Sequence, residues 1–195
     1  MNILNKALQN IFLPLFGLVI LSNCGGDDPI VPPNEEELIT TVNIVFTPTS
    51  GSAVTMKYYD EDGGNGAAAP VVTGGTLTAN TAYSVTLEIL NESVNPTEDI
   101  TVEISEEAED HQFFFEVSSS LNLTLTSYDD QDGNGNPIGL ENTFTTGAAS
   151  SGTLKVILRH EPNKSASGVS SGDITNAAGE TDIETLPAID ITIVD

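Results

Sequence analysis

The sequence predicts an all-β fold, an antiparallel β-sandwich, and three features of the chain indicate it. From residue 39 onward, apolar residues recur at every second position, with almost no helical period. The alternating runs are short and rich in β-branched and aromatic residues, and clusters of Gly, Asn, Asp and Pro separate them. Because each run has one apolar and one polar face, we expect two sheets that pack their apolar faces together.

We expect each alternating run to form a strand. The runs are residues 42–46, 54–59, 83–90, 100–104, 113–117, 121–125, 154–158 and 189–193. Residues 163–179 are rich in Ser, Ala and Gly and lack such alternation, so we expect a long surface loop there.

The stretch that begins at Thr76 carries a local resemblance to a known fold. Leu77, the turn at Asn80 and Tyr83 resemble the tyrosine corner of fibronectin type III domains, in which a Tyr hydroxyl bonds to backbone just upstream. The resemblance implies an immunoglobulin- or fibronectin-like sandwich, although the core Trp of those domains is missing. It implies nothing about function.

Residues 1–23 have the parts of a secretory signal peptide. Lys6 precedes an apolar run over residues 11–21, and no acidic residue lies before that run. The run is shorter than the roughly 20 apolar residues that a spanning helix needs, and Pro14 interrupts it. We therefore expect a cleaved signal peptide and no transmembrane anchor.

Cys24 is the only cysteine of the chain, so no disulfide partner exists within it. The residues that lead to Cys24 resemble a bacterial lipobox, although Asn23 replaces the usual small residue. Gly25-Gly26-Asp27-Asp28 resembles the export signal of Bacteroidota surface lipoproteins. The alternatives are ordinary cleavage that leaves a free thiol, and a merely solvated linker. We expect Cys24 to be lipidated and the protein to be anchored in the outer membrane and exposed at the cell surface.

Residues 24–38 contain three prolines and a run of three glutamates, which favours an extended tether. Residues 39–195 are long enough for a single sandwich domain with its own core. The formal net charge of −24 repels nucleic-acid phosphates and anionic lipid head groups, so we expect no nucleic-acid partner and a membrane link through the lipid alone.

His111 and His160 are the two histidines of the chain, and each is next to an acidic residue, Asp110 and Glu161. Each histidine also lies at the end of an expected strand. If those ends converge, the imidazoles and carboxylates form a site for Zn²⁺, Cu²⁺ or Ni²⁺, or the two histidines clamp a haem iron. The alternative is two polar residues that never meet, since no close spacing such as H-x-H is present.

The segment from Asp130 to Glu141 fits the calcium-loop pattern D-x-[DN]-x-[DN]-G-x5-E. The candidate Ca²⁺ ligands are Asp130, Asp132, Asn134, Asn136 and Glu141. The strand-like flanks and Pro137 differ from an EF-hand. The alternative is a hairpin loop, for which Asp-Gly and Asn-Gly are preferred.

No catalytic motif is present: the sequence lacks G-x-S-x-G, a phosphate-binding loop and H-E-x-x-H, and Cys24 is reserved for the lipid. We therefore expect a protein that is not an enzyme.

Several motifs together resemble one group of proteins. They are the segment from Cys24 to Asp28, the Tyr-Asp-rich loops at Tyr59 and Tyr128, Asp110-His111-Gln112-Phe113, and the segment from Leu158 to Lys164. They look like an uncharacterised family of Bacteroidota surface lipoproteins, some of which accompany TonB-dependent receptors. The resemblance implies a non-catalytic binding module that captures a metal ion or haem for such a receptor. The alternative is a structural or adhesive surface domain without a small ligand, stiffened by Ca²⁺.

Overall fold

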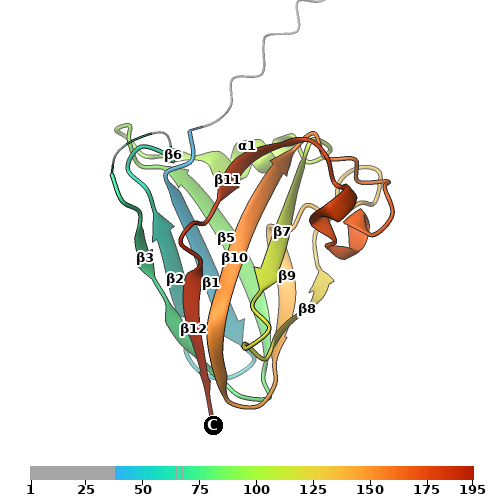
Figure 1. Ribbon diagram of the computed structural model, residues 1–195. Helices are drawn as coiled ribbons and strands as arrows, with labels where there is room; N and C mark the ends of the chain where they lie inside the picture. Colours follow the sequence, from blue (N-terminus) through green and yellow to red (C-terminus); the bar gives the residue numbers. More distant parts are fainter. Residues whose placement is uncertain (1–37, 65, 67) are drawn as a thin grey trace, which may run out of the picture. The chain divides into compact units, whose positions relative to one another are not determined.

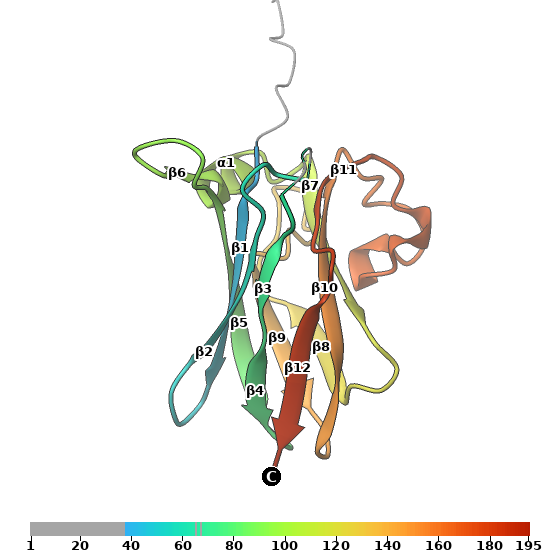
Figure 2. The ribbon, with the colours of Figure 1, turned by 60° about the vertical axis from the view of Figure 1, so that its left-hand side comes forward.

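The computed structural model describes residues 38–64, 66 and 68–195 (Figure 1). It confirms the all-β sandwich: two sheets lie face to face, and their inner side chains form one hydrophobic core (Figure 2). The expected signal peptide, Cys24 and the tether up to residue 37 lie outside the described residues.

The first sheet is antiparallel throughout and runs in the order β3-β2-β1-β5-β9-β8, with β6 paired to β5. Its strands are β1 (Thr41–Pro48), β2 (Val54–Tyr59), β3 (Val71–Thr73), β5 (Ala82–Asn91), β6 (Glu98–Asp99), β8 (Leu123–Tyr128) and β9 (Glu141–Thr146). Most of the alternating runs form strands, because one side of each can enter the core. In β5, for example, buried and exposed residues alternate.

The second sheet is built around β10 (Ser150–His160). One edge of β10 pairs with β7 (His111–Val117), and the other pairs first with β12 (Ile189–Val194) and then with β11 (Glu180–Glu184). β4 (Gly75–Thr78) completes the sheet and runs parallel to β12. β11 was not expected from the sequence, because Ile183 is its single apolar residue.

The corner between β4 and β5 has the hydrogen bond that the local resemblance implied. The backbone N–H of Thr78 donates to the Tyr83 hydroxyl over 2.8 Å, and the side chains of Leu77 and Tyr83 are buried. The structure thus has the hydrogen bond that is typical of a tyrosine corner, while the immunoglobulin- or fibronectin-like form of the sandwich stays a prediction.

One expected strand is wrong: residues 100–104 lie in a helix, α1 (Ile100–Glu106). Asp99 caps the helix by accepting a hydrogen bond from the Thr101 backbone N–H. Ile100 and Ile104 are buried while Val102 is 52% exposed, so the buried residues are one helical turn apart rather than alternate. No helix in the described part of the chain has the length and apolar character to cross a bilayer.

Residues 163–179 form more than a surface loop. They contain two short 3-10 helices, η1 (Val169–Ser171) and η2 (Ile174–Asn176), which lie beside β10 on the outer side of the second sheet (Figure 2). The outward side chains Phe114 and Ile157 form a second hydrophobic cluster with Val169 and Ala177. We call residues 163–179 the flap, since they shield the outer face of the second sheet.

Candidate metal centre

His111 and His160 meet. His111 is the first residue of β7 and His160 is the last of β10, and the two are direct partners in the antiparallel ladder. Phe113 and Leu158, two pairs further along the ladder, belong to the main core. The period of two therefore places both imidazoles on the same inner face. The ring centroids are 4.8 Å apart with an interplanar angle of 71°. Converging strand ends thus bring the two histidines together.

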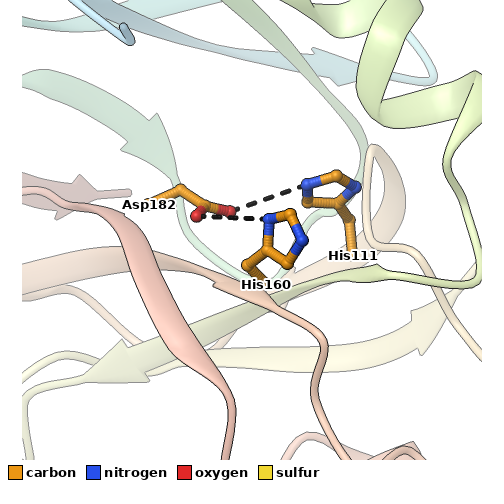
Figure 3. Close-up of side chains that lie close together, drawn as sticks. All are labelled: His111, His160 and Asp182. Atoms are coloured by element: carbon orange, nitrogen blue, oxygen red, sulfur yellow. Dashed lines mark ion pairs between the residues drawn. The ribbon is translucent and has the colours of Figure 1, made fainter. Parts of the chain in front are cut away.

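Asp182, on β11, supplies the carboxylate of the site (Figure 3). The ladder pairs Leu158 with Ile183 but Arg159 with Thr181, so Asp182 is the extra residue of a β-bulge. A bulge interrupts the strict alternation of side chains along a strand. The Asp182 carboxylate consequently points toward the two imidazoles, as the close-up shows.

The donor atoms of the three side chains form a compact group. His111 Nε2 lies 3.7 Å from one carboxylate oxygen of Asp182, and His160 Nδ1 lies 3.7 Å from the other. One ligand atom from each residue lies within 4.8 Å of the others. Two ligands of a tetrahedral Zn²⁺ ion are about 3.3 Å apart, as bonds of about 2.0 Å require. Small side-chain rotations would therefore bring these donors to bonding distance from one ion.

The site is enclosed by protein. The exposed fraction of the side chain is 0% for His111, 12% for His160 and 2% for Asp182. A buried carboxylate is stable only when cations or hydrogen-bond donors compensate its charge. The two imidazoles are at ion-pair distance from Asp182, so they can compensate it when protonated and can share a metal ion with it when neutral.

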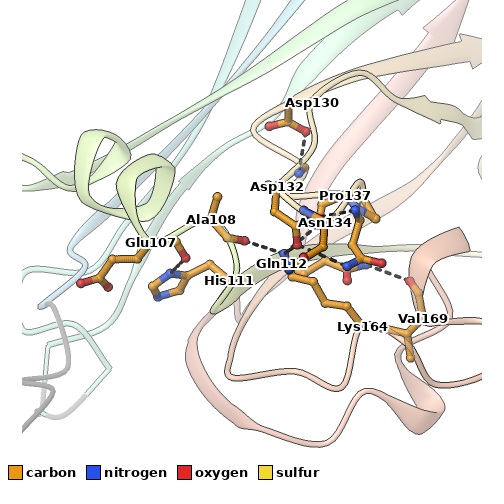
Figure 4. Close-up of polar contacts among 12 residues, drawn as sticks. Glu107, Ala108, His111, Gln112, Asp130, Asp132, Asn134, Pro137, Lys164 and Val169 are labelled. Atoms are coloured by element: carbon orange, nitrogen blue, oxygen red, sulfur yellow. Dashed lines mark hydrogen bonds and ion pairs between the residues drawn. The ribbon is translucent and has the colours of Figure 1, made fainter.

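A backbone carbonyl orients one of the imidazoles. His111 Nδ1 lies 3.2 Å from the carbonyl oxygen of Glu107, the C-cap residue of α1 (Figure 4). A carbonyl oxygen only accepts, so Nδ1 carries the proton, and in the neutral ring Nε2 keeps its lone pair on the side of Asp182. Metal-binding histidines commonly have such a carbonyl partner on the second nitrogen.

Asp110 and Glu161, the acids predicted as metal ligands beside the histidines, do not belong to the group of three donors. Asp110 and Glu161 are both exposed, and their backbones are hydrogen-bonded, with the Glu161 N–H donating to the Asp110 carbonyl over 2.6 Å. They lie at the rim of the sheet, one residue beyond the histidines. Asp182 was not predicted from the sequence because β11 has no clear alternating pattern. Only the bulge on this strand turns Asp182 toward the two histidines.

The histidine pair does not fit a haem clamp. Two imidazoles on opposite sides of one iron would have ring centroids about 6 Å apart, given iron–nitrogen bonds of about 2 Å, with the porphyrin between them. The rings here lie 4.8 Å apart and contact each other edge to face. No porphyrin can enter between them without separating β7 from β10, so the haem alternative is set aside.

In the predicted calcium loop, the carboxylates bind the loop's own backbone. Asp130 accepts hydrogen bonds from the N–H groups of Gly139 and Leu140, each over 2.8 Å. Asp132 accepts from the N–H groups of Asn134 and Asn136, each over 2.9 Å. N–H groups repel a cation, so these carboxylates are arranged as in a hairpin loop that is held by its own acids.

The ammonium group of Lys164 lies in this loop (Figure 4). It donates to Asp132 Oδ2 over 3.1 Å, to the Pro137 carbonyl over 3.1 Å and to the Ala108 carbonyl over 2.5 Å. An ammonium has three donors, and three oxygens receive them. The pair is almost fully buried, with 5% of the Lys164 side chain and 1% of the Asp132 side chain exposed.

Burial raises the pKa of the Asp132 carboxyl, but the hydrogen bonds from the Asn136 N–H, the Lys164 ammonium and the Asn134 N–H outweigh it and hold this pKa below its ordinary value. A fixed positive charge thus already balances Asp132. Of the remaining candidate ligands, Asn136 directs its amide nitrogen at Asp132 and Glu141 is exposed. Calcium binding stays a prediction, and Lys164 is the group with which a Ca²⁺ ion would have to compete.

An open hollow of about 560 Å³ lies beside the candidate metal centre and is lined in part by Glu107 and Asp110. Its wall includes Glu106, Glu107, Glu109 and Asp110 together with Asp132, so it is strongly acidic. The residues that line this hollow do not include His111, His160 or Asp182. The hollow therefore gives no direct opening to the three donor atoms.

Comparison with known proteins identifies no relative: no family model, no curated protein and no solved structure matches this chain. What the fold and the site define is an all-β sandwich with a buried cluster of two histidines and one aspartate.

Proposed function

We propose that this protein is a non-catalytic binding module that holds one divalent transition-metal ion between His111, His160 and Asp182. The observation that carries the proposal is the convergence of one donor atom from each of three strands within 4.8 Å. Two imidazole nitrogens and one carboxylate oxygen suit Zn²⁺, Cu²⁺ and Ni²⁺ better than Ca²⁺ or Mg²⁺, which prefer oxygen ligands only.

The electrostatics of the site support the same ligand class. Asp182 places a carboxylate where 2% of the side chain is exposed, and a divalent cation bound to it would offset the free energy lost on desolvation. The hydrogen bond from His111 Nδ1 to Glu107 favours the tautomer in which Nε2 can bind a metal.

The proposed location rests on the sequence. A lipid on Cys24 and the acidic residues after it favour anchoring in the outer membrane with the domain at the cell surface. The family resemblance adds TonB-dependent receptors as neighbours there. The second candidate function is a structural or adhesive surface domain, and the enclosure of the histidine cluster favours it, since the acidic hollow does not reach the donors.

Titration of the metal-free full chain with Zn²⁺, Cu²⁺ and Ni²⁺ in a calorimeter tests the metal proposal. We expect one tight site for at least one of these ions, and its loss in His160→Ala. Glu161→Gln is the matched control, because it changes the neighbouring exposed side chain and leaves the three donors intact. Equal heats of binding for the wild type and His160→Ala with all three ions would mean that the ions bind only unspecifically to the acidic surface. The proposal would then be abandoned.

A further inference from the structure

We infer that an ion in this site is a permanent part of the fold, which ties the edge strand β11 to the second sheet, rather than a cargo that exchanges with solvent or with a partner. The inference rests on the proposed metal binding and specifies what the ion does. Three relationships among β7, β10 and β11 carry it.

The first is the short and interrupted ladder of β11. Among the described strands, β11 pairs with β10 alone, and it extends only from Glu180 to Glu184. The bulge at Asp182 interrupts even this short ladder. A short edge strand with an interrupted ladder is a segment that opens locally at low cost in free energy. The ion would therefore bind where the bulge interrupts the ladder between β10 and β11.

The second relationship is the cross-link that the ion creates. It would join Asp182 to His160 on the neighbouring strand and to His111 one strand further on. The chain between His160 and Asp182 forms a loop that contains the flap. An ion bound to both residues would close this loop. A link across a loop stabilises the folded state by limiting the freedom of the unfolded chain. Zn²⁺ in structural sites contributes to folding in the same way.

The third relationship is enclosure. The exposed fractions of 0%, 12% and 2% leave little contact between the donors and solvent. Structural zinc sites are closed by protein, whereas catalytic zinc sites keep a coordination position open to water or substrate. Here the ion can leave only when a wall of the site moves, and β11 is the short edge strand whose ladder is interrupted at the site itself. Release is thus coupled to the opening of β11.

Hydrogen exchange of the full chain with and without one equivalent of Zn²⁺ tests the inference. We expect Zn²⁺ to slow exchange of the β11 amides by about tenfold or more, because it suppresses local opening. β3 (Val71–Thr73) is the internal control, since it is a short edge strand of the other sheet and should not respond. In Asp182→Asn, which preserves the size of the side chain, the effect of Zn²⁺ on β11 should disappear.

Transfer of the bound Zn²⁺ to an excess of a chelator separates this inference from the proposed function. We expect the transfer rate to be independent of chelator concentration and equal to the opening rate of β11. Absence of binding of Zn²⁺, Cu²⁺ and Ni²⁺ to the wild type would overturn both conclusions. Binding together with rapid transfer that rises with chelator concentration, and unchanged β11 protection, would overturn the resident ion while the metal-binding function stands.

Discussion

His111, at the start of β7, lies directly across the ladder from His160, at the end of β10, and their rings contact edge to face at 4.8 Å. This pair is fixed by strand register, while Asp182 joins it only through a bulge in a third strand. The three residues therefore differ in how firmly the fold positions them.

The ligand set can be tested by comparing three acids. Asp182→Asn should weaken Zn²⁺ binding by more than the roughly 10–100-fold that loss of an outer partner of a metal ligand typically costs. Asp110→Asn and Glu161→Gln should change affinity only slightly, because both side chains are exposed outside the donor group. Calorimetric titration measures all three. A larger loss of Zn²⁺ affinity in Asp110→Asn or Glu161→Gln than in Asp182→Asn would show that the metal binds at the rim of the sheet instead.

The buried ion pair of Lys164 and Asp132 should matter strongly for stability. Lys164→Met leaves the Asp132 carboxylate buried without its ammonium partner, which typically costs about 3–5 kcal/mol. Lys57→Met is the control, because the Lys57–Glu92 pair is about one-third exposed on both sides, and such pairs contribute about 1 kcal/mol or less. Urea unfolding gives both free energies. Equal losses in the two variants would show that the buried pair contributes no more than the exposed one.

The low pKa of Asp132 predicts a dependence of stability on pH. A carboxyl whose pKa is lower in the folded than in the unfolded state stabilises the fold above the unfolded pKa, and the contribution is lost as the pH falls through the folded pKa. The difference in unfolding free energy between the wild type and Asp132→Asn should therefore shrink between about pH 5 and about pH 2. A difference that stays constant over this range contradicts the prediction.

The lipid anchor has a direct test. Cys24→Ser removes the only thiol of the chain and should shift the protein from the membrane fraction to the soluble fraction. Mass spectrometry of the wild type should show acyl chains on the peptide that begins at Cys24. An unmodified thiol, or a Cys24→Ser protein that stays with the membrane, contradicts the anchor.

The sequence by itself determined the fold class and most of the strands. Period-two alternation is a local signal, and it located strands such as β5 and β10 because one side of each enters the core. It also placed both histidines at strand ends. The local resemblance to fibronectin type III domains, and not the alternation, predicted the hydrogen bond at Tyr83. For residues 100–104 the same signal failed, because Ile100 and Ile104 suit one face of a helix as well as one face of a strand, and the cap at Asp99 and burial of that helical face decided for α1.

Only the tertiary structure decided which residues form the candidate sites. Whether His111 meets His160 depends on the register between strands that are far apart in the sequence, and the position of Asp182 depends on one extra residue in β11. Lys164 enters the predicted calcium loop from a segment beyond β10. Such juxtapositions follow from the packing of whole elements, and no local pattern of residue types encodes them.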